Sequence, residues 1–245
     1  MTHAKPGPGP LALVGGDELN PGNEPQDEVL VRAAGGEPAF VIATAAARHR
    51  PDLAVANARQ WFGALGLEVE ELPALRRSDV GSPANVDRAR AGRFFYLVGG
   101  DPGLVPSVLR DSPVWDAVVQ AWRAGAALAG SSAGAMALGT WTLVKDRHPG
   151  DERRRYVAAL GLVPRVAVLP HFETFGHLWL DSARSAAPAD DVVLLGIDGR
   201  TAAIWERGRW RCLGAGGVTV IAHGGRRSFR SGQRIEALPD PLLGP

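Results

Sequence analysis

The stretch AALAGSSAGAMAL, residues 126–138, decides the fold of this chain. Its first three residues are apolar and predict a buried strand, and residues 135–138 are small and compatible with a helix that follows at once. A strand that runs through Gly130-Ser131-Ser132-Ala133-Gly134 directly into a helix must turn sharply, which strains the central residue and requires small neighbours. The stretch therefore predicts an α/β fold with a tight strand-to-helix turn at Ser132.

The segments before this stretch repeat the same alternation of strand and helix. Short β-branched apolar runs predict strands at 11–14, 40–44, 67–72 and 94–98, and helical spacing predicts helices at 51–65 and 114–124. Such alternation is typical of a doubly wound, mostly parallel sheet covered by helices on both faces.

After residue 138 the pattern changes to strands separated by tight glycine turns. Strands are expected at 141–144, 167–169, 192–195, 202–205 and 218–222, with a hairpin turn at Arg207-Gly208. This region predicts a C-terminal antiparallel extension. The charged residues 146–155 are expected to form a solvated loop.

The composition is that of an ordinary globular protein. The 245 residues are 45% hydrophobic and 22% charged, which predicts a single domain, residues 1–245, with flexible ends at 1–8 and 238–245. A net charge of +1 gives nucleic-acid binding no support. The chain has no apolar run of the roughly 18 to 20 residues that a membrane-spanning helix needs, and its polar N-terminus does not resemble a signal peptide, so a cytoplasmic protein without a membrane partner is expected. A single cysteine, Cys212, excludes an internal disulfide and a thiolate metal site.

The turn at Ser132 also suggests chemistry, because its sequence has the form G-x-S-x-G. A sharp turn lifts the serine hydroxyl clear of its neighbours and leaves the Ala133 N–H at a helix N-terminus, where it can stabilise an oxyanion together with another donor. Two other interpretations remain open. Ser132 can be an ordinary helix N-cap, or the glycines can bind phosphate, although the lysine of the P-loop is missing.

A nucleophilic serine needs a base, and His171 is the best placed of the six histidines. It follows the predicted strand 167–169 and Pro170, at the sheet edge where ligands gather in open α/β folds. His177, at the start of the next helix, is more simply a surface residue. A metal site built from His171, Glu173 and His177 is disfavoured, because histidines six apart do not share a helical face. No metal or organic cofactor is expected.

The chain resembles the serine-peptidase family of aspartyl dipeptidase (peptidase E) and cyanophycinase, which are relatives of class I glutamine amidotransferases. The matching pieces occur in the family's order, and they are Gly9-Pro10-Leu11 into Val14-Gly15-Gly16, Val98-Gly99-Gly100-Asp101, Gly130-Ser131-Ser132-Ala133-Gly134-Ala135, Gly161-Leu162-Val163-Pro164 into His171-Phe172, and Gly196-Ile197-Asp198 into Thr201-Ala202. The resemblance implies a flavodoxin-like sheet and a serine hydrolase acting on small peptides. It also implies Ser132 as nucleophile, His171 as general base, and the N–H groups of Gly100 and Ala133 as the oxyanion hole.

The chain departs from the family where the third member of the triad is expected. The family has a Glu directly after the Asp of the G-I-D segment, and this chain has Gly199 there. Asp198, Glu173 and Asp146 are the alternative acids, although Asp198 can equally cap its own turn. The missing Glu would also fit a catalytically inactive binding or regulatory module on the same fold.

A second departure concerns the substrate. Where the family has arginines after the catalytic histidine, this chain has His177 and Leu180, and Phe175 and Trp179 add apolar bulk nearby. Cyanophycin is therefore not the expected substrate. The expected substrate is a small peptide with neutral or aromatic flanks.

Further expectations concern contacts. Asp101, Phe175 and His177 are expected to contact the substrate. A homodimer would use exposed aromatic surface near one of the tryptophans, of which the candidates are Trp115, Trp122 and Trp179.

Overall fold

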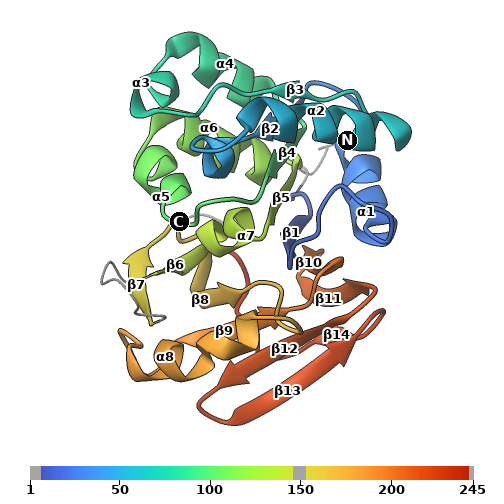
Figure 1. Ribbon diagram of the computed structural model, residues 1–245. Helices are drawn as coiled ribbons and strands as arrows, with labels where there is room; N and C mark the ends of the chain where they lie inside the picture. Colours follow the sequence, from blue (N-terminus) through green and yellow to red (C-terminus); the bar gives the residue numbers. More distant parts are fainter. Residues whose placement is uncertain (1–6, 146–152, 243–245) are drawn as a thin grey trace.

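The computed structural model describes residues 7–145 and 153–242, which form two β-sheets with helices packed around the first (Figure 1). Within these residues the first sheet has eight strands in the order β14-β11-β10-β1-β5-β4-β2-β3. Their bounds, in chain order, are β1 Leu11–Val14, β2 Ala39–Ile42, β3 Glu70–Glu71, β4 Phe94–Leu97, β5 Ala127–Ser131, β10 Thr201–Glu206, β11 Arg209–Gly214 and β14 Arg234–Ile235.

The centre of this sheet is parallel, as the sequence predicts. Strand β5 lies between β1 and β4 and is parallel to both, with Ser131 opposite Val14 and Gly130 opposite Leu97. Side chains on both faces are buried, since Leu11 and Leu13 join one hydrophobic core while the alternate residues of β1 join the other. A strand buried on both faces reads as a continuous apolar run, which is why these strands are visible in the sequence.

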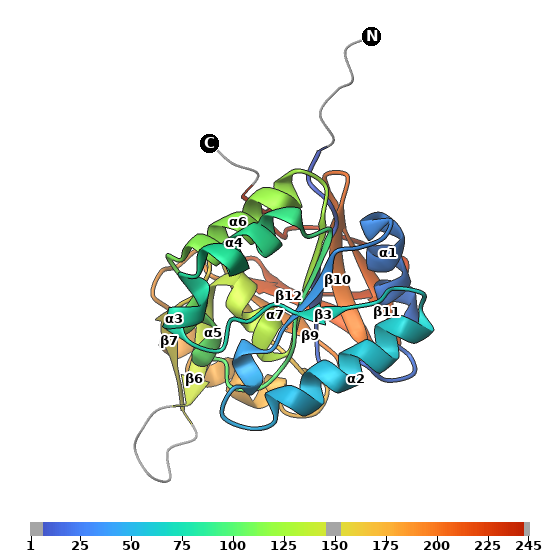
Figure 2. The same ribbon diagram turned by 90° about the horizontal axis from the view of Figure 1, so that it is seen from above.

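Helices cover the two faces of the first sheet (Figure 2). Helices α1 and α2 pack on one face through residues that include Leu30 and Phe62, and α3 to α7 pack on the other through residues that include Val105 and Trp122. The helices and short 3-10 turns are α1 Glu24–Ala34, η1 Thr44–Ala46, α2 Pro51–Ala64, α3 Arg77–Val80, α4 Pro83–Ala91, α5 Leu104–Leu109, α6 Pro113–Arg123, α7 Ala133–Leu138, η2 Gly176–Trp179 and α8 Leu180–Ser185.

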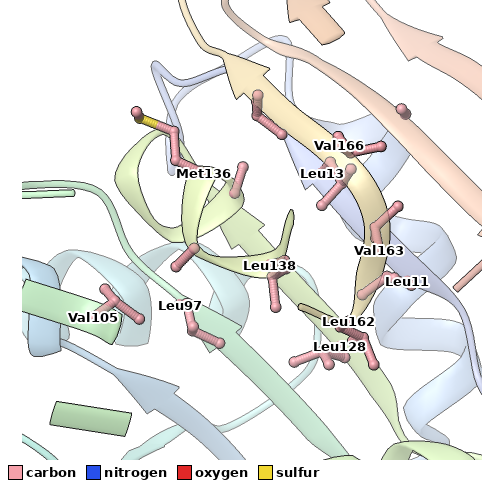
Figure 3. Packing of buried hydrophobic residues seen from close by; sticks show 14 of the residues in the cluster. Leu11, Leu13, Leu97, Val105, Leu128, Met136, Leu138, Leu162, Val163 and Val166 are labelled. Carbon is pink, nitrogen blue, oxygen red and sulfur yellow. The ribbon is translucent and has the colours of Figure 1, made fainter. Parts of the chain in front are cut away.

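A second sheet packs against the α7 side of the first. Its order is β13-β12-β9-β8-β6-β7, and its strands are β6 Gly139–Lys145, β7 Arg154–Ala158, β8 Val163–Leu169, β9 Val193–Ile197, β12 Gly217–Ala222 and β13 Gly225–Arg230. Strands β6, β8 and β9 are parallel, and antiparallel strands flank them. Val163 and Val166 of β8 share a core with Leu11 and Leu13 of β1 (Figure 3). The α/β fold class with antiparallel C-terminal strands is confirmed, and the additional finding is that these strands belong to two sheets.

Local patterns explain which elements the sequence shows and which it hides. The hairpin turn at Arg207-Gly208 is confirmed, since Glu206 pairs with Arg209 and both turn residues have positive φ, 51° and 74°. The sequence does not predict helix α1, because its buried face includes the polar residues Gln26 and Asp27 and therefore lacks apolar periodicity. Strand β13 is charged and, among the described strands, pairs only with β12, so it carries no alternating pattern either.

Two expectations, about the tryptophans and about residues 146–155, need correction. Trp115 and Trp122 are 6% and 0% exposed, so these two cannot form the interface of a homodimer. Arg154 and Arg155 belong to β7 instead of a solvated loop, while 146–152 lie outside the described residues.

Part of the C-terminal segment 238–245, expected to be flexible, makes defined contacts. The indole N–H groups of Trp205 and Trp210 donate to the Asp240 carboxylate and the Pro239 carbonyl, and Leu238 is buried. Among the described helices, none has the length and apolar character needed to cross a membrane.

Candidate active site

The candidate site lies where the parallel strands of the first sheet end. Gly15-Gly16 follows β1, Gly99-Gly100 follows β4, and Ser131-Ser132 ends β5. Because the carboxyl ends of parallel strands meet at one edge, these three turns are neighbours. The turns after β4 and β5 are in close contact, since a Cβ built on Gly99 would lie 3.2 Å from the Ser132 Cβ.

Ser132 adopts the strained conformation that the sequence predicts. Its φ of 49° and ψ of −113° lie outside the ordinary regions for a residue with a side chain, which costs about 1–3 kcal/mol. The turn is so tight that a Cβ on Gly134 would lie 2.3 Å from the Leu97 carbonyl oxygen. The Ser132 side chain makes no capping hydrogen bond to helix α7, so the N-cap interpretation is not supported.

Two backbone N–H groups are available beside Ser132. Ala133 is the first residue of α7, and the N–H groups of a helix's first turn have no acceptor within the helix. Gly100 lies in the neighbouring turn, and among residues 7–145 and 153–242 its N–H has no hydrogen-bond acceptor. These are the two donors that the resemblance implies for an oxyanion hole.

His171 reaches the same edge from the second sheet. It follows β8, has a positive φ of 46°, and donates its N–H to the Gly15 carbonyl at 2.8 Å. Ser132 donates its own N–H to the Val14 carbonyl at 3.0 Å. The segment 14–16 therefore holds both the serine and the histidine through their backbones.

The imidazole of His171 occupies the space above Gly16. A Cβ on Gly16 would lie 2.1 Å from the His171 Nε2, and Gly16 has a φ of 120°, so both contact and conformation require glycine there. The ring stacks on Phe175 with 4.9 Å between centroids, and the histidine side chain is 19% exposed. The ring is thus packed against Phe175 and Gly16, with Nε2 toward the end of β1.

The structure places the predicted acids in two turns. Asp198 accepts the Gly217 N–H at 2.8 Å, and both oxygens of Glu173 accept the Gly199 N–H at 3.0 Å. Each of these carboxylates thereby fixes backbone. Asp146 lies outside the described residues.

Two acids that sequence reasoning missed lie in the loop after β1. Asp17 Oδ1 is 3.7 Å from His171 Nδ1, and among the described residues Asp17 is the carboxylate within ion-pair distance of this histidine. Glu18 accepts the Gly99 N–H at 2.7 Å and the Ser131 hydroxyl at 2.9 Å, so it connects this loop to the turns beside Ser132. In the sequence, the signal that could have revealed Asp17 and Glu18 is their position directly after the glycine pair that ends β1.

The residues expected to contact substrate lie in two places. Phe175 stacks on His171, whereas the His177 Nδ1–H donates to the Phe172 carbonyl at 2.9 Å. Asp101 follows Gly100, pairs with Arg48 at 3.2 Å and borders a cavity of about 540 Å³. Of the described residues, no three His, Cys, Asp or Glu side chains are arranged to hold a metal ion.

Comparisons with known proteins agree with the expected resemblance. The sequence model of peptidase family S51 matches residues 11–203. Cyanophycinases from Nostoc sp. and Synechococcus elongatus are each 31% identical over 195 residues, or 77% of this chain. The aligned regions span 65% and 60% of the lengths of those two relatives, less than two thirds.

Solved structures give the same result. The structure of a peptidase from an acI-B1 Actinobacterium matches with a TM-score of 0.81 and 31% identity, covering 94% of this chain and 97% of that one. A putative peptidase E from Listeria monocytogenes shares the fold, with a TM-score of 0.57 and 17% identity over 85% of this chain.

Proposed function

Because this chain belongs to peptidase family S51, we propose that it is a serine hydrolase that cleaves peptide or amide bonds in small peptides. The observation that carries the proposal is that Ser132 and His171 are both held by the same segment, residues 14–16, at the end of β1. Both have a positive φ, and both are hydrogen-bonded through their backbone N–H to the 14–16 segment. Strain of this kind persists where the surrounding structure holds it, and it gathers at active sites.

The proposed reaction uses the groups around Ser132. The Ser132 Oγ attacks the substrate carbonyl carbon while its proton passes to His171 Nε2, and the N–H groups of Gly100 and Ala133 stabilise the negative charge that develops on the carbonyl oxygen. His171 then gives the proton to the leaving amine as the C–N bond breaks. A water molecule, deprotonated by His171, hydrolyses the acyl ester and restores the serine.

The surroundings of the histidine support a substrate other than cyanophycin. The His177 ring is bound to the Phe172 carbonyl, and Leu180 packs against the hydrophobic core, so neither presents a guanidinium to a carboxylate. One face of the His171 ring is covered by Phe175, which in turn contacts Trp179 at 5.4 Å between centroids. The Arg154 guanidinium lies 4.1 Å from the centroid of the Trp179 ring, so Phe175 is the aromatic surface that suits neutral or aromatic residues.

The cavity beside Asp101 begins one residue after the proposed oxyanion donor Gly100, and its lining does not include Ser132 or His171, so it suits the part of a small substrate that extends away from the reacting bond. Its volume of about 540 Å³ falls in the usual range of about 300–1,000 Å³ for small-molecule sites. Arg155 lines it together with the Arg48–Asp101 pair, so Arg155 could bind the free carboxylate of a peptide. A dipeptide or tripeptide satisfies both conditions.

An activity screen tests this proposal. Wild type, Ser132→Ala and His171→Ala are incubated with a library of dipeptides and tripeptides and with cyanophycin, and amine release is measured. We expect hydrolysis of a subset of small peptides by the wild type and a loss of about 10⁴-fold or more in both variants. A fluorophosphonate probe should label the wild type and leave Ser132→Ala unlabelled.

The same screen separates the hydrolase from the inactive module. A wild-type protein that neither hydrolyses any peptide nor reacts with the probe would contradict the hydrolase. The Asp17 carboxylate on the Nδ1 side of His171 favours the hydrolase, because a carboxylate there can hold the imidazole in the orientation that a general base needs.

A further inference from the structure

We propose that Asp17 is the acid that positions His171 in the catalytic reaction. The inference rests on the proposed function, and it assigns the third member of the triad to the loop after β1 instead of to any of the three acids that the sequence suggested.

The first support is the orientation of the imidazole. The two ring nitrogens face different parts of the molecule, since Nε2 lies over Gly16 while Nδ1 lies 3.7 Å from Asp17 Oδ1. A carboxylate on the Nδ1 side holds the tautomer that leaves Nε2 free to accept the serine proton. A distance of 3.7 Å is longer than a hydrogen bond, and catalytic hydrogen bonds are often long in the absence of substrate and shorten when it binds.

The second support is how the Asp17 carboxylate is used. Asp198 and Glu173 accept backbone N–H groups, whereas the Asp17 oxygens face cationic or ionisable side chains. Asp17 Oδ2 lies 3.9 Å from Arg200 Nε, so the guanidinium compensates the carboxylate charge on the side away from the imidazole. This leaves Oδ1 available to accept the Nδ1–H of His171.

The third support is the anchoring of the Asp17 backbone. Its φ of 53° is unfavourable for a residue with a side chain, and the surrounding contacts hold it. The Asp17 carbonyl accepts the side-chain amide of buried Asn23 at 2.7 Å, and Asn23 in turn accepts the Gln26 amide at 2.8 Å. A loop fixed in this way presents the carboxylate at a constant position.

The fourth support is the absence of a side chain at residue 199, opposite Asp17. A Cβ built on Gly199 would lie 2.8 Å from Asp17 Oδ2 and 3.0 Å from Glu173 Oε1. The absence of a side chain at residue 199 therefore gives the Asp17 carboxylate its room. It also means that a carboxylate attached at residue 199 could take the same place, provided that Asp17 is shortened and the exposed Glu173 side chain shifts.

The test measures kcat and KM of Asp17→Asn on a peptide that the wild type hydrolyses, together with the rate of labelling by a fluorophosphonate. We expect kcat to fall by about 10³–10⁴-fold while KM changes less than about threefold, and the labelling rate to fall in parallel. Asp87→Asn, which removes an exposed acid of α4 paired with Arg90, is the matched control for lost surface charge and should behave as wild type.

A carboxylate relocated to residue 199 separates a positioning role from a structural one, because a purely structural role of Asp17 predicts no recovery of activity. Asp17→Ala should lose activity like Asp17→Asn. The double variant Asp17→Ala/Gly199→Glu should have a kcat at least about tenfold higher than that of Asp17→Ala, because the new carboxylate can reach the place that Asp17 leaves. Thermal unfolding of each variant checks that the fold is retained. If the double variant fails to fold, Asp17→Glu serves instead and should retain more activity than Asp17→Ala.

The possible outcomes distinguish this inference from the proposed function. Activity in Asp17→Asn within about threefold of wild type, with Ser132→Ala inactive, overturns the role of Asp17 and leaves the hydrolase standing. Loss of activity in Asp146→Asn with Asp17→Asn unaffected does the same and assigns the acid to Asp146. A wild-type protein that neither hydrolyses peptides nor labels overturns both.

Discussion

The loop after β1 and the turn after β9 carry acids at the same edge of the molecule, and they use them differently. In the turn after β9, the Asp198 carboxylate accepts the Gly217 N–H, and Glu173 accepts the Gly199 N–H from across the site. In the loop after β1, the Asp17 carboxylate faces the His171 imidazole and the Arg200 guanidinium. A carboxylate bound to backbone N–H groups builds a turn, and one that faces a ring nitrogen can orient a base.

Among substitutions outside the proposed Ser132, His171 and Asp17 triad, the largest effect should come from filling the space that the imidazole occupies. Gly16→Ala would place a Cβ 2.1 Å from His171 Nε2, so the ring must move away from the end of β1. Activity should then fall by at least about 10²-fold, since a displacement of about 1 Å costs that much. The measurement is kcat/KM beside the thermal unfolding midpoint.

Gly36→Ala is the matched control for this substitution. Gly36 has a similar φ of 134°, but a Cβ at residue 36 would meet nothing within 4 Å, so alanine adds backbone strain without a contact. Both variants should be destabilised by about 1–2 kcal/mol, and Gly36→Ala should keep its activity. Equal activity in the two variants would contradict the placement of His171 over Gly16.

An effect on stability is expected from Asp27, a buried acid in helix α1 that faces neither the histidine nor a turn. Burial raises its pKa from 3.8 to about 7, although the Trp61 indole N–H donates to it at 2.8 Å and opposes the shift. The folded state therefore binds a proton that the unfolded state releases above pH 3.8. Its contribution to stability is present below that pH and is lost as the pH rises to about 7.

Asp27→Asn removes this dependence and should leave activity unchanged. At a pH of about 4 the variant and the wild type should have similar free energies of unfolding. At a pH of about 8 the variant should be more stable by up to about 4 kcal/mol, which is the shift converted at about 1.4 kcal/mol per pH unit. Urea unfolding at the two pH values measures the difference, and a difference that stays constant with pH would refute a raised pKa for Asp27.

The smallest effect on catalysis is expected from Asp198 and Glu173, whose carboxylates accept backbone N–H groups. Asp198→Asn and Glu173→Gln each keep an oxygen that can accept the same backbone N–H, so kcat should stay within about fivefold of wild type and stability should fall by about 0.5–1.5 kcal/mol. A loss of about 10³-fold in kcat at an unchanged unfolding midpoint would show that the substituted acid, instead of Asp17, positions His171.

How far the sequence predicts the molecule depends on whether a feature is local. Strand β1 is visible because both of its faces are buried, and the turn at Ser132 is visible because its tightness demands small neighbours. Helix α1 and strand β13 are hidden because one buries polar residues and the other is a charged edge strand. The pairing of β6, β8 and β9 in a second sheet is hidden for another reason, since nothing in a strand's own pattern states which sheet it joins.

By itself, the sequence determined the strand, turn and helix around Ser132 and the position of His171 at the end of a strand, because residue types and spacing set both of these. Tertiary structure decided which carboxylate meets the imidazole. Asp17 and His171 follow strands of two different sheets, and only the packing of β8 against β1 brings their side chains to 3.7 Å. The same packing placed Asp198 and Glu173 beside backbone N–H groups, and the buried Gly217 N–H in particular needs an acceptor within the fold.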